Sequence, residues 1–486
     1  SFAVYTLLIV GLGLLSARRA TDTDEDYYLG GRSLGPWMAA LSASASAESG
    51  WVTLGLVGWA FASGFSAYWV LPGCLLGFVV NWFVIAPRLR NRSVETGAVT
   101  VPDFFALHYR ERVPVLRITS VVVILVAMWL YVAAQFAAAG TAFSAAFDGV
   151  GYSAGVLIGT AIVLFWTDAA QAVVMVGVLA VFPAWLLLDG GGYASLRETL
   201  AAETGRDLLR FTPEAAGMAL VGFLLGSGAL GINLGFLGAP HMLVRFMAMR
   251  DPRDVRIAGT VSIAWAALIF WGAVTIGLLA RAMTIEGAEW TAPMAAELAG
   301  GSGNAGQESL VLAARELLPG VLSGLALAAV FAAICSTADS QLVVAASACT
   351  SDLYARLARR EDRGRGHTLI NRAAVFGLGL AAMGVVVGGE VQIFSYVLEF
   401  AWAILGAAFG PQVLLALLWR RSSHAGAVAG MLTGFTVAIA WKLLQDAELL
   451  GGDVGGLYNL TVAFTAATAV HVTVSLLRPD RNAAAG

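Results

Sequence analysis

Four acidic side chains interrupt long apolar stretches of this 486-residue chain: Glu48, Asp168, Asp339 and Glu399. Ionisable groups inside apolar helices are costly to bury and usually have a function. No Lys or Arg is predicted at a comparable depth, so these acids are expected to bind a cation or to carry a proton. Capping of a helix end is the alternative for Asp168, and Glu399 is placed near a helix end.

A second set of candidate ligands lies in the segment Ala333-Ile-Cys-Ser-Thr-Ala-Asp-Ser340. On a helix, positions 333, 336, 337 and 340 share one face. That face carries the hydroxyls of Ser336, Thr337 and Ser340, together with one backbone carbonyl. Hard oxygen ligands suit an alkali cation better than a transition metal. The alternative is that each hydroxyl bonds back to its own helix.

Two apolar stretches contain breaks that would position such ligands. Residues 42–51 read Ser-Ala-Ser-Ala-Ser-Ala-Glu-Ser-Gly-Trp, and residues 226–235 read Gly-Ser-Gly-Ala-Leu-Gly-Ile-Asn-Leu-Gly. An unwound helix inside a membrane is stable only where it lines a cavity or holds a ligand. Close packing of helices on small residues is the alternative for either break alone. The matched pair predicts a binding site at the middle of the membrane.

The composition predicts an all-α protein that crosses the membrane many times. The chain is 58% hydrophobic and 13% charged, whereas about 25% of residues are charged in a soluble domain. A net charge of −3 and the absence of a basic block exclude a nucleic-acid partner. No obligate protein partner is indicated, and no nucleophile–base pair or metal cluster indicates an enzyme.

Counting apolar runs long enough to span a bilayer predicts about 13 transmembrane helices in one transporter domain, residues 1–486: 2–17, 36–62, 66–86, 115–147, 151–166, 168–188, 215–239, 256–281, 318–349, 369–388, 392–419, 425–445 and 457–477. The first run is interpreted as a slightly truncated span rather than a signal peptide. The connection 282–317, rich in glycine, is expected to be a flexible loop. If the first helix is set aside, the two broken helices are five positions apart, as an inverted repeat of five plus five predicts.

The basic residues predict the orientation. With the N-terminus outside and 13 alternating spans, 23 of the 29 basic residues fall on the cytoplasmic side with the C-terminus. The six on the outside are Arg197, Arg206, Arg210, Arg281, Arg315 and Lys442. This asymmetry favours a multi-pass protein of the cell membrane (plasma or inner membrane), surrounded by the lipid bilayer.

Several ordered motifs resemble the sodium:solute symporter family, in particular its sodium/proline symporter branch. The matching segments lie at residues 28–36, 41–46, 49–51, 166–171, 240–247, 336–341, 351–354 and 406–411. The resemblance implies a leucine-transporter-like inverted repeat, with repeats at about 36–188 and 215–419. One extra N-terminal helix (2–17) and two C-terminal helices (425–445 and 457–477) would lie at the periphery.

The resemblance also implies site residues. The main sodium site would use backbone oxygens of Ala45, Glu48 and Ala333 and the hydroxyls of Ser336 and Thr337. A second sodium site, found in some members, would map to Asp168, Ser336, Asp339 and Ser340. The substrate pocket would map to Ser49, Trp51, Tyr131, Ile232, Phe236 and Pro240. Trp402 is also expected near this cavity.

The chain departs from the proline branch at several of these positions. The branch has Asp at the position of Ala47 and Met at that of Glu48. It has Trp and Tyr where this chain has Ile232 and Phe236, which makes the predicted pocket more apolar. Asp339 replaces a Ser of the family and adds negative charge. The family also has a longer segment between positions 165 and 166.

The sequence therefore predicts a sodium-coupled symporter that imports a small solute, proline or a related amino acid first, with sodium as the coupling ion. The alternatives are a sodium symporter for another organic acid or solute, and a transporter-derived sensor without transport.

Overall fold

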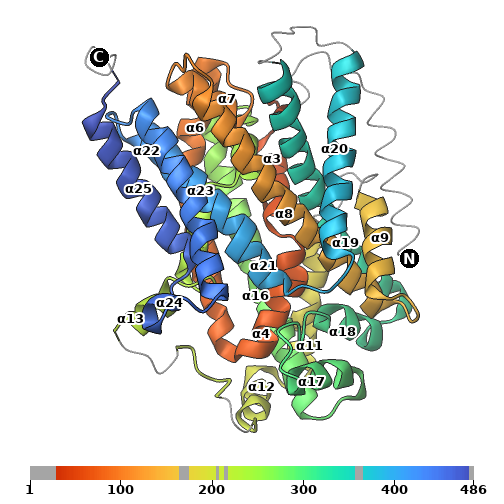
Figure 1. Ribbon diagram of the computed structural model, residues 1–486. Helices are drawn as coiled ribbons and strands as arrows, with labels where there is room; N and C mark the ends of the chain where they lie inside the picture. The colour runs from red at the N-terminus through yellow and green to blue at the C-terminus, as the bar shows by residue number, and fades with distance from the viewer. Residues whose placement is uncertain (1–28, 164–174, 204–206, 213–216, 356–364, 481–486) are drawn as a thin grey trace.

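The computed structural model describes residues 29–163, 175–203, 207–212, 217–355 and 365–480. Within these ranges the chain is helical, and the one β feature is an isolated bridge between Leu34 and Met249. The all-α prediction is thus confirmed for the described part of the chain (Figure 1). The predicted first span, 2–17, lies outside it.

Seven helices in the described residues are long and apolar enough to cross a membrane: Trp51–Thr96, Val115–Ala146, Pro252–Ile285, Gly320–Thr350, Ile393–Leu418, His424–Asp446 and Asn459–Leu477. An eighth is possible if the pair Gly177–Asp189 and Gly192–Ala201, bent by 76°, forms one span. The first of the seven covers two predicted stretches. They meet at Gly64, whose φ of +67° lets the chain turn between α4 (Val57–Ser63) and α5 (Val70–Val80). Other predicted spans are short, broken or outside the described residues, so the count of 13 stays a prediction.

The first predicted break is present. Helix α3 (Pro36–Ala47) begins with proline, which suits the first position of a helix. It ends at Glu48, where φ is −101° and ψ is 82°. After Gly50 the chain continues as a π-helical turn, η2 (Trp51–Leu56), and then as α4. A Cβ on Gly50 would lie 2.5 Å from the Cβ of Ala138, so only glycine fits against α8 (Val115–Ala146).

The second predicted break is also present. Helix α13 (Met218–Leu224) ends before the glycines, and η6 (Leu230–Ile232), α14 (Asn233–Phe236) and α15 (Pro240–Met247) follow as short pieces. The indole N–H of Trp402 donates to the carbonyl of Ile232 at 3.1 Å. The side-chain amide of Asn81 donates to the carbonyl of Phe236 at 2.8 Å. Two side chains thus satisfy carbonyls that the break leaves without helical partners.

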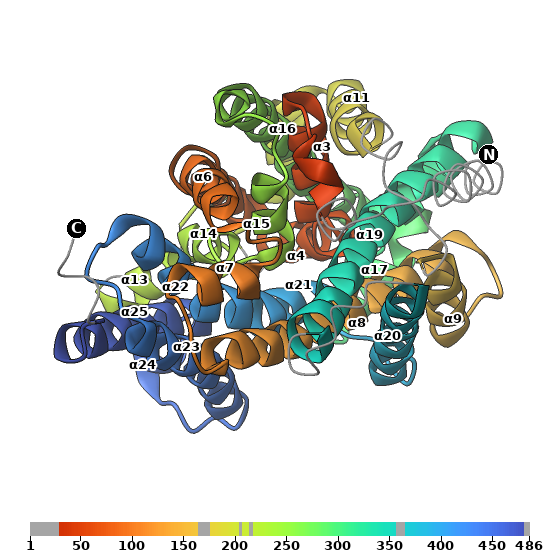
Figure 2. The same cartoon turned by 90° about the horizontal axis from the view of Figure 1, so that it is seen from above.

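The first broken helix lies in the interior of the bundle. Seen from above, α3 and α4 lie between α16 (Val255–Ile285) on one side and α8 and α19 (Gly320–Ser347) on the other (Figure 2). The long helix α22 (Ala403–Leu418) follows η10 (Val397–Trp402), and α23 (His424–Asp446) and α25 (Asn459–Leu477) pack together at one edge. Helices α9 (Tyr152–Val163), α11 (Phe182–Asp189) and α20 (Arg365–Val386) complete the wall.

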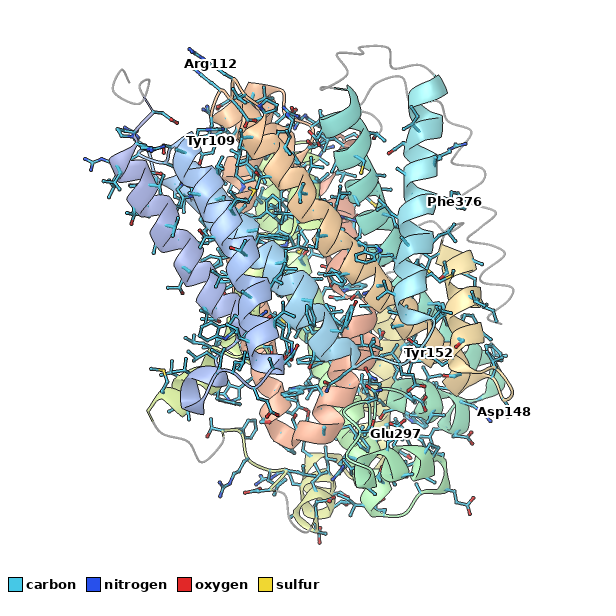
Figure 3. All side chains as sticks on the ribbon, viewed as in Figure 1. Tyr109, Arg112, Asp148, Tyr152, Glu297 and Phe376 are labelled. Carbon is cyan, nitrogen blue, oxygen red and sulfur yellow. The ribbon has the colours of Figure 1, made fainter. Side chains whose placement is uncertain are left out.

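Short helices cap both ends of the bundle. Arg112 and Tyr109, which follow α6 (Ala86–Thr96) and α7 (Val101–His108), lie at one end, and Asp148, Tyr152 and Glu297 lie at the other (Figure 3). The second end carries α12 (Gly192–Ala201), α17 (Ala292–Ala299) and α18 (Ser309–Leu317). The prediction of a flexible loop at 282–317 is therefore wrong: two helices occupy much of it.

A buried ion cluster ties three segments together at the end that carries α7. The guanidinium of Arg117, near the start of α8, contacts the carboxylates of Asp103 in α7 at 2.8 Å and of Asp352 in η9 (Ala348–Ala355) at 2.7 Å. The hydroxyl of Thr100 also donates to Asp352 at 3.0 Å. All three charged side chains are at least nine-tenths buried. The stability of this cluster therefore depends on each buried charge keeping its partner.

Arg117→Met should strongly destabilise the protein, because it leaves two buried carboxylates without a cation. Removing one partner of a buried ion pair costs about 3–5 kcal/mol. Thermal unfolding of the purified protein in detergent measures the effect, and Arg112→Met, at an exposed position nearby, is the control. Equal unfolding temperatures for the two variants would contradict a structural role for the cluster.

Candidate functional site

The end of α3 meets the hydroxyl-bearing face of α19. The hydroxyl of Ser336 lies 3.1 Å from the carbonyl oxygen of Ala45 and 3.2 Å from that of Ala333. The hydroxyl of Thr337 donates to the carbonyl of Ser46 at 3.4 Å. Four of the five residues of the predicted main sodium site thus lie together, and the fifth, Glu48, is the residue at which α3 ends. This cluster of carbonyl and hydroxyl oxygens has the chemistry of an alkali-cation site.

An arginine occupies the neighbouring position, one turn further along α19. The guanidinium of Arg245 in α15 donates from Nη2 to the hydroxyls of Ser46 at 2.5 Å and Ser340 at 2.7 Å, and from Nε to that of Ser42 at 2.9 Å. The prediction that no basic residue lies at this depth is therefore wrong. Ser340 belongs to the predicted second sodium site, so that site would share a ligand with a fixed positive charge. Asp168 lies outside the described residues.

Buried rings from four elements lie together at the predicted substrate pocket. Phe236 packs against Trp402 with ring centroids 4.7 Å apart, and Tyr131 of α8 lies edge-on to Trp402 at 6.3 Å and to His241 at 6.2 Å. His241 follows Pro240 at the start of α15. The pocket residues Tyr131, Phe236 and Pro240 are thus brought together, and Ile232 joins them through its carbonyl, which Trp402 binds.

The first break carries the polar part of the same region. The amide of Gly50 donates to the side-chain oxygen of Gln135 at 2.9 Å, and the amide nitrogen of Gln135 reaches the hydroxyl of Ser49 at 3.4 Å. The indole of Trp51 donates to the carbonyl of Ala47 at 3.1 Å. Its ring packs towards Phe270 and Phe394, at 5.7 and 6.2 Å, rather than into the ring cluster around Trp402.

Several buried polar atoms in this region have no hydrogen-bond partner. They are the Tyr131 hydroxyl, both ring nitrogens of His241, the side-chain amide of Gln341, the Thr53 hydroxyl and Oε1 of Glu48. Buried polar groups are nearly always paired, and leaving one unpaired costs about 1–3 kcal/mol. These unpaired groups beside the two breaks make the region a candidate site for a polar ligand.

Glu399 lies away from this region. Its carboxylate pairs with Lys442 of α23 at 2.9 Å, and its carbonyl accepts from the amide of Asn459 at 2.6 Å. The prediction that Glu399 lacks a basic partner is therefore wrong. This pair holds η10 against the peripheral helices α23 and α25.

The glycine-rich segment before α18 covers the other end of the first broken helix. Gly306, with a φ of +84°, packs on Phe61 of α4 so closely that a Cβ would lie 2.4 Å from the ring. The side chain of Gln307 accepts from the amide of Ile393, at the start of α21 (Ile393–Tyr396), at 2.8 Å and donates to the carbonyl of Val391 at 3.4 Å. This segment is a packed cover over the region rather than a free loop.

The profile of the sodium:solute symporter family matches residues 27–434. The chain belongs to the sodium:solute symporter family. Sodium/proline symporters of Staphylococcus aureus strains JH9 and COL are 32% identical to it over 498 aligned residues, covering 98% of this chain and 91% of theirs. This is a family of transporters, which confirms the prediction that the chain is not an enzyme.

A solved structure of a Na⁺-coupled sialic acid symporter, in a substrate-bound outward-open state, shares the fold. The TM-score is 0.74 at 16% sequence identity, with 98% of this chain and 97% of the other covered. The two chains therefore share their fold over nearly their whole length.

Sequence reasoning missed several residues of the candidate site. Gln135, His241 and Gln341 lie in it, and Trp265 of α16 donates from its indole nitrogen to the carboxylate of Glu48 at 2.5 Å. His241 and Gln341 belong to motifs that the family resemblance already contained, which was the available signal. Gln135 and Trp265 lie inside apolar runs with no motif around them.

Glu308, just before α18, makes the packed cover sensitive to pH. Burial, and then the charges of Glu297 and Glu390, raise the pKa of Glu308 to about 7. A carboxyl whose pKa is raised on folding stabilises the fold at low pH, and this contribution is lost as the pH rises from about 4.5 to 7. The melting temperature of Glu308→Gln minus that of the wild type should therefore be larger at pH 8 than at pH 5.

Differential scanning fluorimetry at the two pH values measures this difference. Glu198→Gln, at an exposed position of α12, is the control and should show no such change. A Glu308→Gln difference that does not vary with pH would contradict the assignment.

Proposed function

We propose that this chain is a sodium-coupled symporter that imports a small solute, proline or a related amino acid first. The observation that carries the proposal is the contact between the broken end of α3 and the Ser336–Thr337 face of α19, in a chain of the sodium:solute symporter family. The 32% identity to sodium/proline symporters supports an amino-acid substrate.

The main sodium site would comprise the carbonyl oxygens of Ala45, Glu48 and Ala333 and the hydroxyls of Ser336 and Thr337. In the described structure the Ser336 hydroxyl bonds to the first and third of these carbonyls. A sodium ion would replace these bonds, since the hydroxyl would turn its lone pairs towards the cation. Sodium would then bridge α3 and α19 and favour one arrangement of the two helices.

Coupling follows from this bridge. If sodium holds the break at 48–50 in the substrate-ready conformation, sodium must raise the substrate affinity, and substrate must raise the sodium affinity by the same factor. The second site at Asp168, Ser336, Asp339 and Ser340 remains part of the proposal. Its sodium would lie beside the guanidinium of Arg245, so the negative charge of Asp339 would be needed to offset the repulsion.

The substrate pocket would comprise Ser49, Tyr131, Ile232, Phe236 and Pro240, with Trp51 at its edge. Unpaired groups of Tyr131 and His241 support a zwitterionic or polar head group, and the rings of Phe236 and Trp402 support an apolar body. The apolar wall, with Ile232 and Phe236, also admits a symporter for another organic acid or solute, which is the second candidate.

The proposal includes 13 spans, the inverted repeat of five plus five, and an outside N-terminus in the cell membrane. Arg112 lies at the end that the proposal places in the cytoplasm (Figure 3), where basic residues collect. A sensor without transport would bind solute and sodium but move neither.

Ser336→Ala combined with Thr337→Ala should abolish sodium-stimulated uptake, because it removes both hydroxyl ligands from the α3–α19 contact. Labelled amino acids are offered to proteoliposomes with and without an inward sodium gradient. Ser347→Ala is the matched control, since this hydroxyl lies on the same helix and bonds to its own backbone at Val344. If uptake by the double variant depends on sodium as it does in the wild type, the assignment of the sodium site is wrong. No accumulation by the wild type under any cation gradient would contradict transport.

Tyr131→Phe should raise the substrate KM by about tenfold, because an unpaired buried hydroxyl that binds substrate contributes about 1–3 kcal/mol. Uptake kinetics in the same proteoliposomes measure the change. Tyr152→Phe removes another buried, unpaired hydroxyl, at the far end of the bundle (Figure 3), and should leave KM unaltered. If Tyr131→Phe and Tyr152→Phe have the same KM, the substrate does not bind at the Tyr131 hydroxyl.

A further inference from the structure

Gln135 of α8 is a buried polar residue whose side chain reaches the first break. Its side-chain oxygen accepts a hydrogen bond from the amide of Gly50 at 2.9 Å, and its amide nitrogen donates to the hydroxyl of Ser49 at 3.4 Å. A backbone N–H can only donate, so the oxygen of the side chain has to face Gly50 and its NH2 group has to face Ser49. The break therefore fixes the orientation of this amide.

The face of α8 that carries Gln135 packs directly on the break. Tyr131, Gln135 and Ala138 lie at positions i, i+4 and i+7 of the helix, which share one face. A Cβ on Gly50 would lie 2.5 Å from the Cβ of Ala138 and 3.2 Å from the side-chain oxygen of Gln135. This close approach leaves little room for the break to shift relative to α8.

The hydroxyl of Ser49 accepts two hydrogen bonds. One comes from the side-chain amide of Gln135 at 3.4 Å, and the other comes from the backbone amide of Trp51 at 3.3 Å. A serine oxygen has two acceptor sites and one O–H donor. Since both acceptor sites are in use, the O–H is the group left for a further partner, and no residue in the described part of the chain accepts it.

A second hydroxyl in the proposed substrate pocket also lacks a partner. The Tyr131 hydroxyl is a neighbour of Ser49 and makes no hydrogen bond within the described structure. Two hydroxyls that can donate to the same region suit a solute group that accepts. Amino acids and organic acids, the two solute classes under the proposed function, share an ionised carboxylate, whose oxygens only accept.

We propose that Gln135 is a positioning residue that makes Ser49 a hydrogen-bond donor to an acceptor oxygen of the solute. The inference rests on the proposed function and deepens it. Gln135 occupies one acceptor site of the Ser49 hydroxyl, which leaves the O–H to bind a carboxylate oxygen. Gln135 thus sets the affinity for the solute through Ser49 and does not itself touch the solute.

Gln135→Met tests this role, because methionine is similarly long and unbranched but has no amide to orient Ser49. We expect the KM for labelled L-proline to rise about fivefold, a modest change because the 3.4 Å contact is long for a hydrogen bond. In the Ser49→Ala background the same substitution should leave KM unchanged, since the hydroxyl that Gln135 orients is already absent.

Gln412→Met is the matched control. It removes another buried glutamine, which lies in α22 and bonds to the carbonyl of Ala408 and to His471 of α25. Its KM for L-proline should equal that of the wild type, because these contacts lie among the peripheral helices.

The experiment uses the full-length protein in proteoliposomes with an inward sodium gradient. Uptake gives KM, kcat and the sodium concentration at half-maximal rate under saturating L-proline. For Gln135→Met the last two should stay within about twofold of the wild type, as expected when a substitution weakens solute binding alone. A residue that merely supported the fold of the break would alter them, because the proposed sodium ligands Ala45 and Glu48 directly precede it.

An equal rise in KM from Gln135→Met in the wild-type and Ser49→Ala backgrounds would overturn this inference and leave the proposed function standing. A fall in kcat or an altered sodium dependence with no change in KM would also overturn it. If Gln135→Met does not fold, Gln135→Asn carries the same expectations, since its side chain is one methylene shorter and draws the amide back from Ser49. Failure of the wild type to accumulate L-proline would contradict the first substrate of the proposed function, and this inference with it.

Discussion

The break between α3 and η2 leaves backbone carbonyls inside the bundle, where lipid and packed side chains exclude water. Such groups must find partners within the protein. Ser336 and Thr337 of α19 approach the carbonyls of Ala45 and Ser46, and Trp51 caps that of Ala47. The structure around this point depends on that requirement, because α19 has to lie against α3 with its hydroxyl-bearing face. The same oxygen atoms that satisfy the backbone are the ones a small cation would use.

The second break also leaves backbone carbonyls without helical partners, and different groups bind them. Trp402 and Asn81 donate to the carbonyls of Ile232 and Phe236. A Cβ on Gly235 would lie 1.9 Å from the indole nitrogen of Trp402, so glycine is required for this close approach. The ring of Trp402 also packs against Phe236 and forms part of an apolar wall. One break thus offers small hydroxyls suited to an ion, and the other offers rings suited to the body of an organic solute.

Several buried charged side chains in the described part of the chain are paired with groups of opposite charge. Arg117 is paired with Asp103 and Asp352, and Glu399 with Lys442. Arg245 is shared among three hydroxyls. In the described segments, the carboxylate of Glu48 accepts a hydrogen bond from the indole of Trp265. Glu48 is therefore held by a neutral donor rather than by a cation, next to the proposed sodium ligands.

The sequence by itself determined the helical class, the positions of both breaks and the face of α19 that carries Ser336 and Thr337. These features are local, since apolar length, small residues and helical spacing are visible within a few turns. Only the tertiary structure decided which groups pair across the bundle. Arg245 reaches Ser46, 199 positions away, and Trp265 reaches Glu48, 217 positions away. No local pattern specifies such partners, because they depend on how α15 and α16 pack against α3. The sequence therefore indicated the candidate ligands, whereas packing decided which side chains lie against them.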